Sequence, residues 1–307
     1  MKTPWTTAGI PPQNGKLAIV TGATGGLGYE TSLALATAGA EVILTGRSQQ
    51  KGRDALARIA QQSPSARIRY EDLDLASLAS VAAFAERFLA TGRPLDLLIN
   101  NAGVMALPTR KLTADGFEMQ FGTNHLGHFA LTGLLLPALR RATHPRVTNV
   151  SSLAHRGGKI FFDDLQAQQS YKPWPRYQQS KIANLYFTFE LQRRSDADHW
   201  NITVNAAHPG FARTDLIANG PGANSIQARG SRIIGRFLSH TAAAGALPTL
   251  FAATAPDAQP SGYYGPNGFY EMKGAVKAAY IHPRAKDADI AKKLWDISEQ
   301  LTGVRWP

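Results

Sequence analysis

The chain has 307 residues, of which 44% are hydrophobic and 18% charged, and it contains no cysteine. This composition is typical of a folded protein, and it excludes disulfides, thiolate metal sites and cysteine nucleophiles. The formal net charge is +11, but no basic run is longer than the doublets at 140–141 and 193–194. We therefore expect a basic surface that attracts an anionic small molecule, and no nucleic-acid partner. A chain without cysteine also fits a reducing compartment, and we expect a cytoplasmic location.

Residues 1–15 form an N-terminal extension without the apolar core of a signal peptide. From residue 17 onward, apolar runs of strand length alternate with helix-length segments, which predicts a parallel sheet covered by helices. The predicted strands are 17–21, 41–45, 67–71, 95–100, 146–151 and 202–207, followed by a short seventh strand at 262–265. The predicted helices are 27–39, 50–62, 77–91, 113–141, 175–195 and a final helix at 287–301.

Two segments need separate comment. The longest apolar stretch, 126–139, is too short and too interrupted to cross a bilayer, so we expect a buried helix there. The segment 211–240 is rich in Gly, Asn and Arg and breaks the alternation. We interpret it as a substrate lid and not as a domain boundary. The whole chain, 1–307, is therefore predicted to be one domain.

A glycine-rich turn, "TGATGGLG", follows the first predicted strand and opens the first predicted helix. Its spacing, T-G-x-x-x-G-x-G, places Gly22, Gly26 and Gly28 where backbone can approach a pyrophosphate at a helix N-terminus. Tight turns between strand and helix also need glycine, but the position after the first strand favours nucleotide binding. The turn lacks the G-K-[ST] ending of a nucleoside triphosphate loop, which argues against ATP hydrolysis.

The end of the second strand distinguishes between dinucleotides. A site for NAD usually has an acidic residue there, which holds the ribose 2′-hydroxyl. Here the sequence is "ILTGRS", with Arg47 and no carboxylate. An arginine can pair with a 2′-phosphate, so we favour NADP(H). The alternative is that Arg47 is a solvated residue that opens the next helix.

Five motifs occur in order along the chain: "TGATGGLG", "NNAG" (100–103), "NVSS", "YQQSK" and "HPGFART" (208–214). With them, the chain resembles the short-chain dehydrogenase/reductase family over nearly its whole length. The segments "TNHLGHF", "VTNVSSLAH" and "YQQSKIAN" look most like its retinol dehydrogenase-like branch, near light-dependent protochlorophyllide reductase. The N-terminal membrane anchor of vertebrate retinol dehydrogenases is absent, and we expect none. The long interval before "YQQSK", with 155–174, is similar to that branch and is expected to form part of the substrate wall.

The resemblance implies an α/β fold: a single-domain, Rossmann-like three-layer α/β/α sandwich with a mostly parallel seven-stranded sheet. It also implies four catalytic residues: a general acid/base, its activating amine, a hydroxyl that orients the carbonyl, and an amide that holds a relay water. These are, in that order, Tyr177, Lys181, Ser152 and Asn124.

The chemistry agrees with this implied assignment. A carbonyl that accepts hydride develops negative charge on oxygen and needs a proton donor. A tyrosine titrates near pH 10, and an ammonium nearby lowers that pKa. Lys181 lies one helical turn from Tyr177, so we expect it to lower the tyrosine pKa. A Tyr-x-x-x-Lys pair also occurs by chance, and Ser151 and Ser152 alone would be ordinary turn residues.

The same resemblance implies further contacts. The cofactor-binding residues would be Gly22, Thr24, Gly25, Gly26, Leu27, Gly28, Arg47, Asp74, Leu75, Asn101, Ala102, Gly103, Tyr177, Lys181, Pro209, Gly210 and Thr214. Asp74 would receive the adenine amino group, whereas Asn100 is expected to be a structural residue that ties strands together. The substrate-binding residues would be Ser152, His155, Tyr177 and Phe211.

Histidines are the remaining candidates for chemistry. His125 and His128 lie three apart on a predicted helix, but no third ligand accompanies them at a metal-site spacing, so we expect packed helix residues and no metal. His155 and His208 flank the predicted pocket, where they contact substrate or have a structural role.

The sequence therefore predicts an NADP(H)-dependent carbonyl reductase/alcohol dehydrogenase that acts on a hydrophobic ketone, aldehyde or alcohol. The expected pocket segments include 160–162, 172–174 and 268–274. One alternative is an NADPH-dependent reductase of carbon–carbon double bonds, and another is a non-catalytic NADP(H)-binding regulator. By resemblance to the family, a homodimer or homotetramer is also expected.

Overall fold

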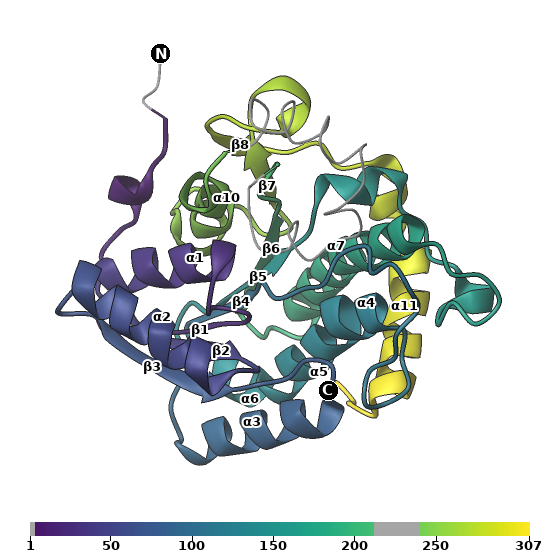
Figure 1. The fold of residues 1–307 in the computed structure, drawn as a ribbon, viewed down its shortest axis with the longest axis horizontal. Coiled ribbons are helices and arrows are strands. Elements are labelled where there is room, and N and C mark those ends of the chain that lie inside the picture. Colours follow the sequence, from purple (N-terminus) through teal and green to yellow (C-terminus); the bar gives the residue numbers. More distant parts are fainter. Residues whose placement is uncertain (1–3, 212–239) are drawn as a thin grey trace.

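A computed structural model describes residues 4–211 and 240–307 of the chain. The predicted cofactor residue Thr214 and nearly all of the predicted lid lie outside the described residues. A single sheet runs through the described part of the protein (Figure 1). Its strands are β1 (Leu17–Val20), β2 (Glu41–Gly46), β3 (Arg67–Asp72), β4 (Leu97–Asn100), β5 (Arg146–Val150), β6 (Thr203–Ala207), β7 (Tyr263–Pro266) and β8 (Val276–Ala278).

The strand order is β3-β2-β1-β4-β5-β6-β7-β8. Each neighbouring pair from β3 to β7 is parallel, and β8 pairs with β7 in the antiparallel direction. The α/β fold and the mostly parallel sheet are confirmed, and the sheet has one strand more than the seven predicted. β8 has only three residues, "VKA", and none of them is buried. It therefore lacks the apolar run from which a strand could be predicted.

The helices lie on both faces of the sheet. The α-helices are α1 (Gly26–Thr37), α2 (Gln49–Gln62), α3 (Leu78–Ala90), α4 (Met119–Phe121), α5 (Gly127–Leu134), α6 (Leu136–Leu139), α7 (Pro173–Ala197), α10 (Ala242–Thr254) and α11 (Ala288–Thr302). A π-helical turn, η2 (Gly122–Leu126), joins α4 to α5. Short 3₁₀ helices are η1 (Thr7–Gly9), η3 (Leu153–Gly157), η4 (Phe162–Asp164), η5 (Phe269–Glu271) and η6 (Pro283–Lys286).

Two of these helical regions differ from the sequence prediction. The helix expected at 113–141 is divided into α4, η2, α5 and α6, and Pro137 stands in the first turn of α6. No helix is predicted at 242–254, where α10 forms. Its sequence, "AAAGALPTLFAAT", contains a glycine and an internal proline, which both weaken a helix. Contacts with α1, β5, β6 and β7 supply the packing that this helix needs.

Alternating residues of each central strand face two separate cores. In β1, Leu17 and Ile19 point to the core formed with α3, α5, α7 and α11. Ala18 and Val20 point to the core formed with α1, α2 and α10. This alternation puts apolar side chains on both faces of the strand, which is why β1 reads as a continuous apolar run. Within residues 4–211 and 240–307, no helix combines the length and apolarity that crossing a bilayer requires.

An aromatic cluster closes the first core at the C-terminus. Phe129 of α5 lies 4.9 Å from Trp295 of α11 and 5.5 Å from Trp306, measured between ring centres. The two tryptophan rings are themselves 4.7 Å apart, and Phe187 of α7 lies 5.9 Å from Trp295. One of these ring pairs is edge-on and the others are tilted, and aromatic pairs at these distances stabilise a core beyond the area they bury. The last residues of the chain are therefore part of the folded core.

We expect Phe129→Ala to lower the free energy of unfolding by about 3–5 kcal/mol, because it leaves a cavity beneath two tryptophans. Urea unfolding followed by tryptophan fluorescence would measure this loss. Leu112→Ala is the control, since that side chain is 47% exposed; its expected effect is within about 0.5 kcal/mol. Similar losses for the two variants would contradict the prediction.

Candidate active site

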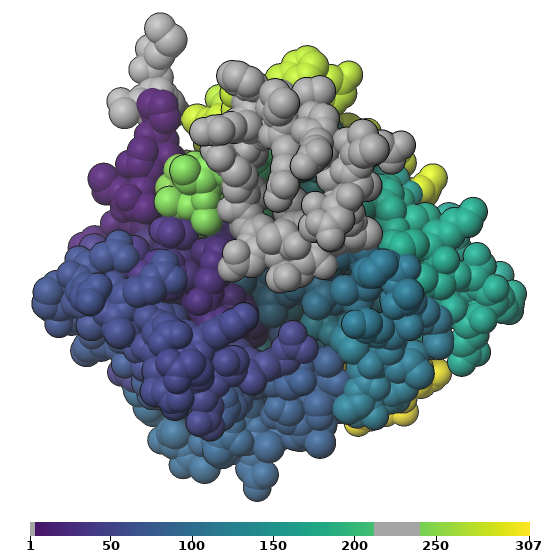
Figure 2. Space-filling model, viewed as in Figure 1, coloured from purple at the N-terminus to yellow at the C-terminus, as the bar shows by residue number. Residues whose placement is uncertain are grey.

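A cavity of about 1050 Å³ opens at the carboxyl ends of the parallel strands. It lies where the strand order reverses, between β1 and β4, which is the usual ligand position in open α/β sheets. In Figure 2, the purple N-terminal part of the chain and the teal middle part meet along a hollow near the centre of the face. The predicted site residues that line the cavity are Gly22, Thr24, Gly25, Gly26, Leu27, Gly28, Arg47, Asp74, Leu75, Asn101, Ala102, Gly103, Ser152, Tyr177, Lys181, Pro209, Gly210 and Phe211.

The glycine loop forms one end of this cavity. Gly22 and Gly26 have φ of +63° and +54°, which glycine adopts without strain. A Cβ on Gly28 would lie 2.4 Å from the Gly22 carbonyl oxygen, so only glycine fits there. The residue before α1, Gly25, offers no side chain to cap the helix. The first N–H groups of α1 are therefore left for another acceptor, and a phosphate fits that position.

Thr21, directly before this loop, joins it to His128 and to the end of β4. The Thr21 hydroxyl accepts the backbone N–H of Asn101 at 2.9 Å and of Ala102 at 3.0 Å. His128 lies with Nε2 2.8 Å from that hydroxyl and Nδ1 3.0 Å from the Asn124 carbonyl oxygen. Burial lowers the pKa of His128 to about 4, so the ring is neutral at pH 7. His128 is thus a packed helix residue that links the glycine loop to η2, a link that the sequence pattern does not reveal.

Cations surround the far end of the glycine loop. Arg47 is exposed directly after β2, and residues 44–48 include no carboxylate. Lys51 and Arg58 of α2 also line the cavity, together with Asp54, and none of the three is predicted as a site residue. The guanidinium of Arg58 lies 4.0 Å over the centre of the Tyr29 ring. This end of the cavity is therefore suited to an anionic group.

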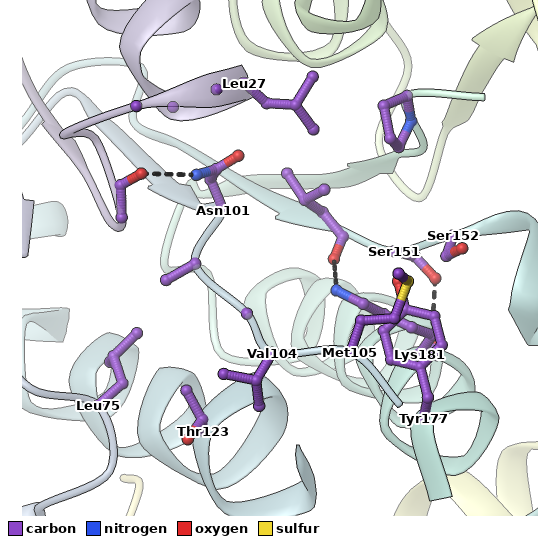
Figure 3. Close-up of a pocket in the computed structure, with 18 of the residues that line it drawn as sticks. Leu27, Leu75, Asn101, Val104, Met105, Thr123, Ser151, Ser152, Tyr177 and Lys181 are labelled. Carbon is purple, nitrogen blue, oxygen red and sulfur yellow. Dashed lines mark hydrogen bonds between the residues drawn. The ribbon is translucent and has the colours of Figure 1, made fainter. Parts of the chain in front are cut away.

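Tyr177, Lys181 and Ser152 gather at the opposite end (Figure 3). Lys181 donates from Nζ to the Val150 carbonyl oxygen at 3.1 Å and lies 5.7 Å from the centre of the Tyr177 ring. Ser151 also lines the cavity, but its hydroxyl proton is already donated to the Lys181 carbonyl at 2.7 Å. Ser152 Oγ accepts the Ala154 N–H at 3.1 Å and interacts with Tyr177. Of the two serines, Ser152 is the one available for chemistry.

The tyrosine pKa differs from the expectation. Burial raises the pKa of Tyr177 to about 12, and the hydrogen bond with Ser152 opposes that rise. Lys181 is itself buried, which lowers the pKa of its amine to about 8. The net pKa of Tyr177 is therefore raised in this state of the protein, in contrast to the expected lowering. Desolvation of the phenol outweighs the effect of an amine that is directed to the Val150 carbonyl.

Asn124 lies in the π-helical turn η2, fully buried and outside the cavity lining. Its side-chain oxygen accepts the Val104 N–H at 2.8 Å, and its amide donates to the Val104 carbonyl at 2.9 Å and to Ser180 Oγ at 2.9 Å. A Cβ on Gly103 would lie 3.1 Å from the Asn124 oxygen and 3.6 Å from Lys181 Nζ. Asn124 thus fixes the segment after β4 beside Lys181, and its part in a proton relay stays a prediction.

The remaining histidines and Asn100 have structural partners. His155 is fully buried, with Nδ1 2.7 Å from the Ser152 carbonyl oxygen. The structure therefore places His155 behind Ser152 and outside the cavity lining, in contrast to the predicted substrate contact. His208 is also buried, with Nε2 3.3 Å from a Glu271 oxygen, at ion-pair distance but without hydrogen-bond alignment. His125 contacts Ser298, and Asn100 joins β4 to Asn149 of β5 at 2.8 Å.

Apolar side chains form the cavity wall near Tyr177. Trp174 is 49% exposed, and its ring centre lies 5.5 Å from that of Tyr177. Phe211, which is 41% exposed, and Met105 also line this end. Of the predicted wall segments, neither 160–162 nor 268–274 reaches the cavity lining. Ile160 and Phe162 pack against a buried cluster instead.

Comparison with known proteins agrees with this geometry. The family model described as short chain dehydrogenase matches residues 16–221. The chain belongs to the short-chain dehydrogenase family. It is 41% identical over 293 residues to human retinol dehydrogenase 12, covering 95% of this chain and 88% of the relative. It is 38% identical over 300 residues to polyprenol dehydrogenase of Danio rerio, covering 96% and 89%. These relatives place it in the retinol dehydrogenase-like branch of a family of oxidoreductases.

Solved structures of the short-chain dehydrogenase family have the same fold. An uncharacterized protein of Mycobacterium paratuberculosis superposes with a TM-score of 0.82 at 40% identity, covering 99% of this chain and all of that one. A protein of Beutenbergia cavernae, named as an NAD(P)-dependent gluconate 5-dehydrogenase and bound to NADP, has a TM-score of 0.62 at 25% identity. That match covers 80% of this chain and 91% of the other. Together with the glycine loop, these matches indicate a nicotinamide cofactor for this short-chain dehydrogenase.

We expect Lys181→Met to be more stable than the wild type at pH 7, because burial disfavours the charged amine in the folded state. Above about pH 8 the folded protein releases this proton, whereas the unfolded chain keeps it up to its usual pKa of 10.5. The unfolded state then binds more protons, so the stability of the wild type rises with pH across this window. The advantage of the variant should therefore shrink between pH 8 and 10.5.

Urea unfolding at several pH values from 7 to 10 would measure this difference. Lys111→Met is the control, because Lys111 is exposed and does not line the cavity. A stability difference between Lys181→Met and the wild type that is independent of pH would contradict the prediction.

Proposed function

We propose that this short-chain dehydrogenase interconverts a hydrophobic ketone or aldehyde and the corresponding alcohol with NADP(H), and that Tyr177 is its general acid/base. The observation that carries the proposal is the grouping of Tyr177, Ser152 and Lys181 in one cavity with a glycine loop at its other end. A bound nicotinamide would supply or accept the hydride, and the side chains of the protein would handle the proton.

The hydroxyl of Ser152 is prepared to donate a hydrogen bond. Its oxygen already accepts the Ala154 N–H, so its own proton is directed elsewhere. A carbonyl oxygen beside Tyr177 would receive that proton as a hydrogen bond, which stabilises the negative charge that develops on oxygen. Tyr177, with a raised pKa, holds its proton at pH 7 and would donate it to the same oxygen during reduction.

Lys181 would assist Tyr177 when the reaction runs as oxidation of an alcohol. Oxidation of an alcohol requires Tyr177 to accept a proton, which its burial disfavours. A positive charge 5.7 Å from the ring centre favours the phenolate within a low-dielectric site. The amine is held in place by the Val150 carbonyl, so it does not need to reorganise. Lys181 thus partly compensates the cost that burial imposes on the ionised tyrosine.

The wall near Tyr177 supports a hydrophobic substrate. Trp174, Phe211 and Met105 present apolar surface beside the proposed reacting position. Large apolar side chains around a few polar groups are usual in sites for small hydrophobic ligands. The relatives named as retinol and polyprenol dehydrogenases also carry names of extended hydrophobic alcohols. A bulky apolar carbonyl or alcohol is therefore the proposed class.

We expect Tyr177→Phe to reduce kcat by about 100-fold or more, because the variant keeps the ring but has no proton to transfer. The experiment first screens the wild type for NADPH oxidation with aromatic ketones, aldehydes and retinoid-like compounds, and then compares the variant on every active substrate. Tyr270→Phe is the control, since Tyr270 is 68% exposed and does not line the cavity. Unchanged turnover in Tyr177→Phe would contradict the proposed mechanism. With an enone substrate, a saturated ketone as the sole product would identify a carbon–carbon double-bond reductase instead.

The preference for NADP(H) is proposed from Arg47 and Lys51, two cations beside the end of β2 where an acidic residue is absent. We expect Arg47→Ala to weaken NADPH binding about tenfold, as for the loss of one hydrogen bond to a charged group, and to leave NADH binding unchanged. Isothermal calorimetry with both cofactors would measure this. Arg53→Ala is a matched control, because Arg53 is an exposed cation of α2 that bonds Gln50 and does not line the cavity. A wild type that prefers NADH would contradict the proposal.

Three further properties stay predictions: a cytoplasmic location, a homodimer or homotetramer, and a single domain with an N-terminal extension and a lid. The lid falls almost wholly outside the described residues. None of these properties is needed for the proposed reaction.

A further inference from the structure

The backbone carbonyl of Ser152 is contacted by donors from the next turn of the chain and from a distant strand. His155 donates its own N–H at 3.1 Å and places Nδ1 at 2.7 Å from that oxygen. The hydroxyl of Tyr263, from β7, lies 3.3 Å from the same oxygen. Ser152 itself has an extended backbone at the end of β5. Its peptide is therefore held by two side chains that do not belong to the strand.

The surroundings of His155 fix its tautomer. A carbonyl oxygen can only accept, so Nδ1 must carry the ring proton. Nε2 then lacks a proton, and it is the acceptor that faces the His282 N–H at 3.4 Å. Burial lowers the pKa of His155 to about 4, which keeps the ring neutral at pH 7. Both ring nitrogens thus have roles that agree with one neutral tautomer.

Tyr263 completes this arrangement. Its hydroxyl also lies 3.3 Å from His155 Nδ1, but that nitrogen already carries a proton. The hydroxyl donates to the Ser152 carbonyl and also interacts with the side chain of the neighbouring Ser151. The two rings meet edge to face, with centres 5.3 Å apart and an interplanar angle of 89°. His208 also packs against Tyr263, with ring centres 5.2 Å apart, and all three side chains are buried.

Neither His155 nor Tyr263 reaches the cavity. Both are buried, and the lining residues around them are Ser152, Ala154 and Arg156. Any influence of His155 on the reaction must pass through the residue that it holds. Rotation of the Ser152 peptide would move the Ser152 hydroxyl, and small errors of aim are costly in an active site.

We propose that His155 is a positioning residue, which together with Tyr263 fixes the peptide of Ser152 so that the Ser152 hydroxyl stays directed at Tyr177 and at the substrate oxygen. This inference rests on the proposed function, because it needs Ser152 to take part in the reaction. It assigns to a buried histidine a role in catalysis that is exerted without contact with substrate or cofactor.

A double-mutant cycle tests this inference. His155→Leu and His155→Asn are made in the wild type and in Ser152→Ala, and kcat, KM and NADPH affinity are measured with the best substrate of the screen. We expect His155→Leu to lower kcat about 10-fold to 100-fold with NADPH affinity unchanged. His155→Asn, whose side-chain amide can donate in place of Nδ1–H, should recover most of that loss. In Ser152→Ala, loss of His155 should lower kcat no further than about twofold, because the group it positions is gone.

Tyr263→Phe is a second test of the inference that perturbs the fold less. It removes one hydroxyl, and we expect about a threefold lower kcat in the wild type and no change in Ser152→Ala. Tyr186→Phe is its matched control, because Tyr186 is equally buried and donates to the Arg284 carbonyl at 2.8 Å, away from the site. The control should lower the melting temperature to a similar extent and leave kcat unchanged.

Two results would overturn the inference. If the loss of kcat from His155→Leu adds fully to that from Ser152→Ala, His155 does not act through Ser152. Where His155→Leu does not fold, the same comparison is made with Tyr263→Phe. If kcat is unchanged while the melting temperature falls, its role is purely structural. A wild type without turnover on any substrate is a different outcome, since it contradicts the proposed function and the role of His155 with it.

Discussion

The site depends on a buried ammonium group. Lys181 is 4% exposed, and the one polar partner of its amine among the described residues is the carbonyl of Val150, at the carboxyl end of β5. Burial of such a group is unfavourable, and the lowered pKa of Lys181 reflects this. Contacts around it fix its position: Gly103 packs beside Nζ, Asn124 fixes the segment that contains Gly103, and Ser151 ties the Lys181 backbone to the strand end. The same burial that destabilises the folded protein places a positive charge beside Tyr177.

Much of the fold is encoded locally and could be predicted. The strands read as apolar runs because both of their faces are buried, and β1 shows how alternate residues serve two cores. The glycine loop, Ser152, Tyr177 and Lys181 have recognisable residue types at recognisable spacings, and the structure brings them to one cavity. Local sequence is sufficient here because each motif follows a strand end or lies on a single helix.

What could not be predicted depends on contacts between distant segments. His155 and Tyr263 lie 108 residues apart, so nothing near His155 in the sequence shows that it faces away from the cavity. The raised pKa of Tyr177 could not be predicted for the same reason. Its cause is desolvation, which depends on the assembled site and not on the helical spacing of Tyr177 and Lys181. The π-helical turn η2 and the helix α10 are likewise stabilised by packing against distant segments, which their own residues do not predict.

The C-terminal helix has a consequence for assembly. α11 packs along α7 and against α5, and Trp295 and Trp306 fill the space over Phe129 and Phe187. The outer surfaces of α5 and α7 at these positions are therefore occupied by the chain itself (Figure 1). A second copy could not pair with these helices there without first displacing α11 and its tryptophans from the core. Self-association of this protein, in whatever number of copies, would have to use a different part of its surface.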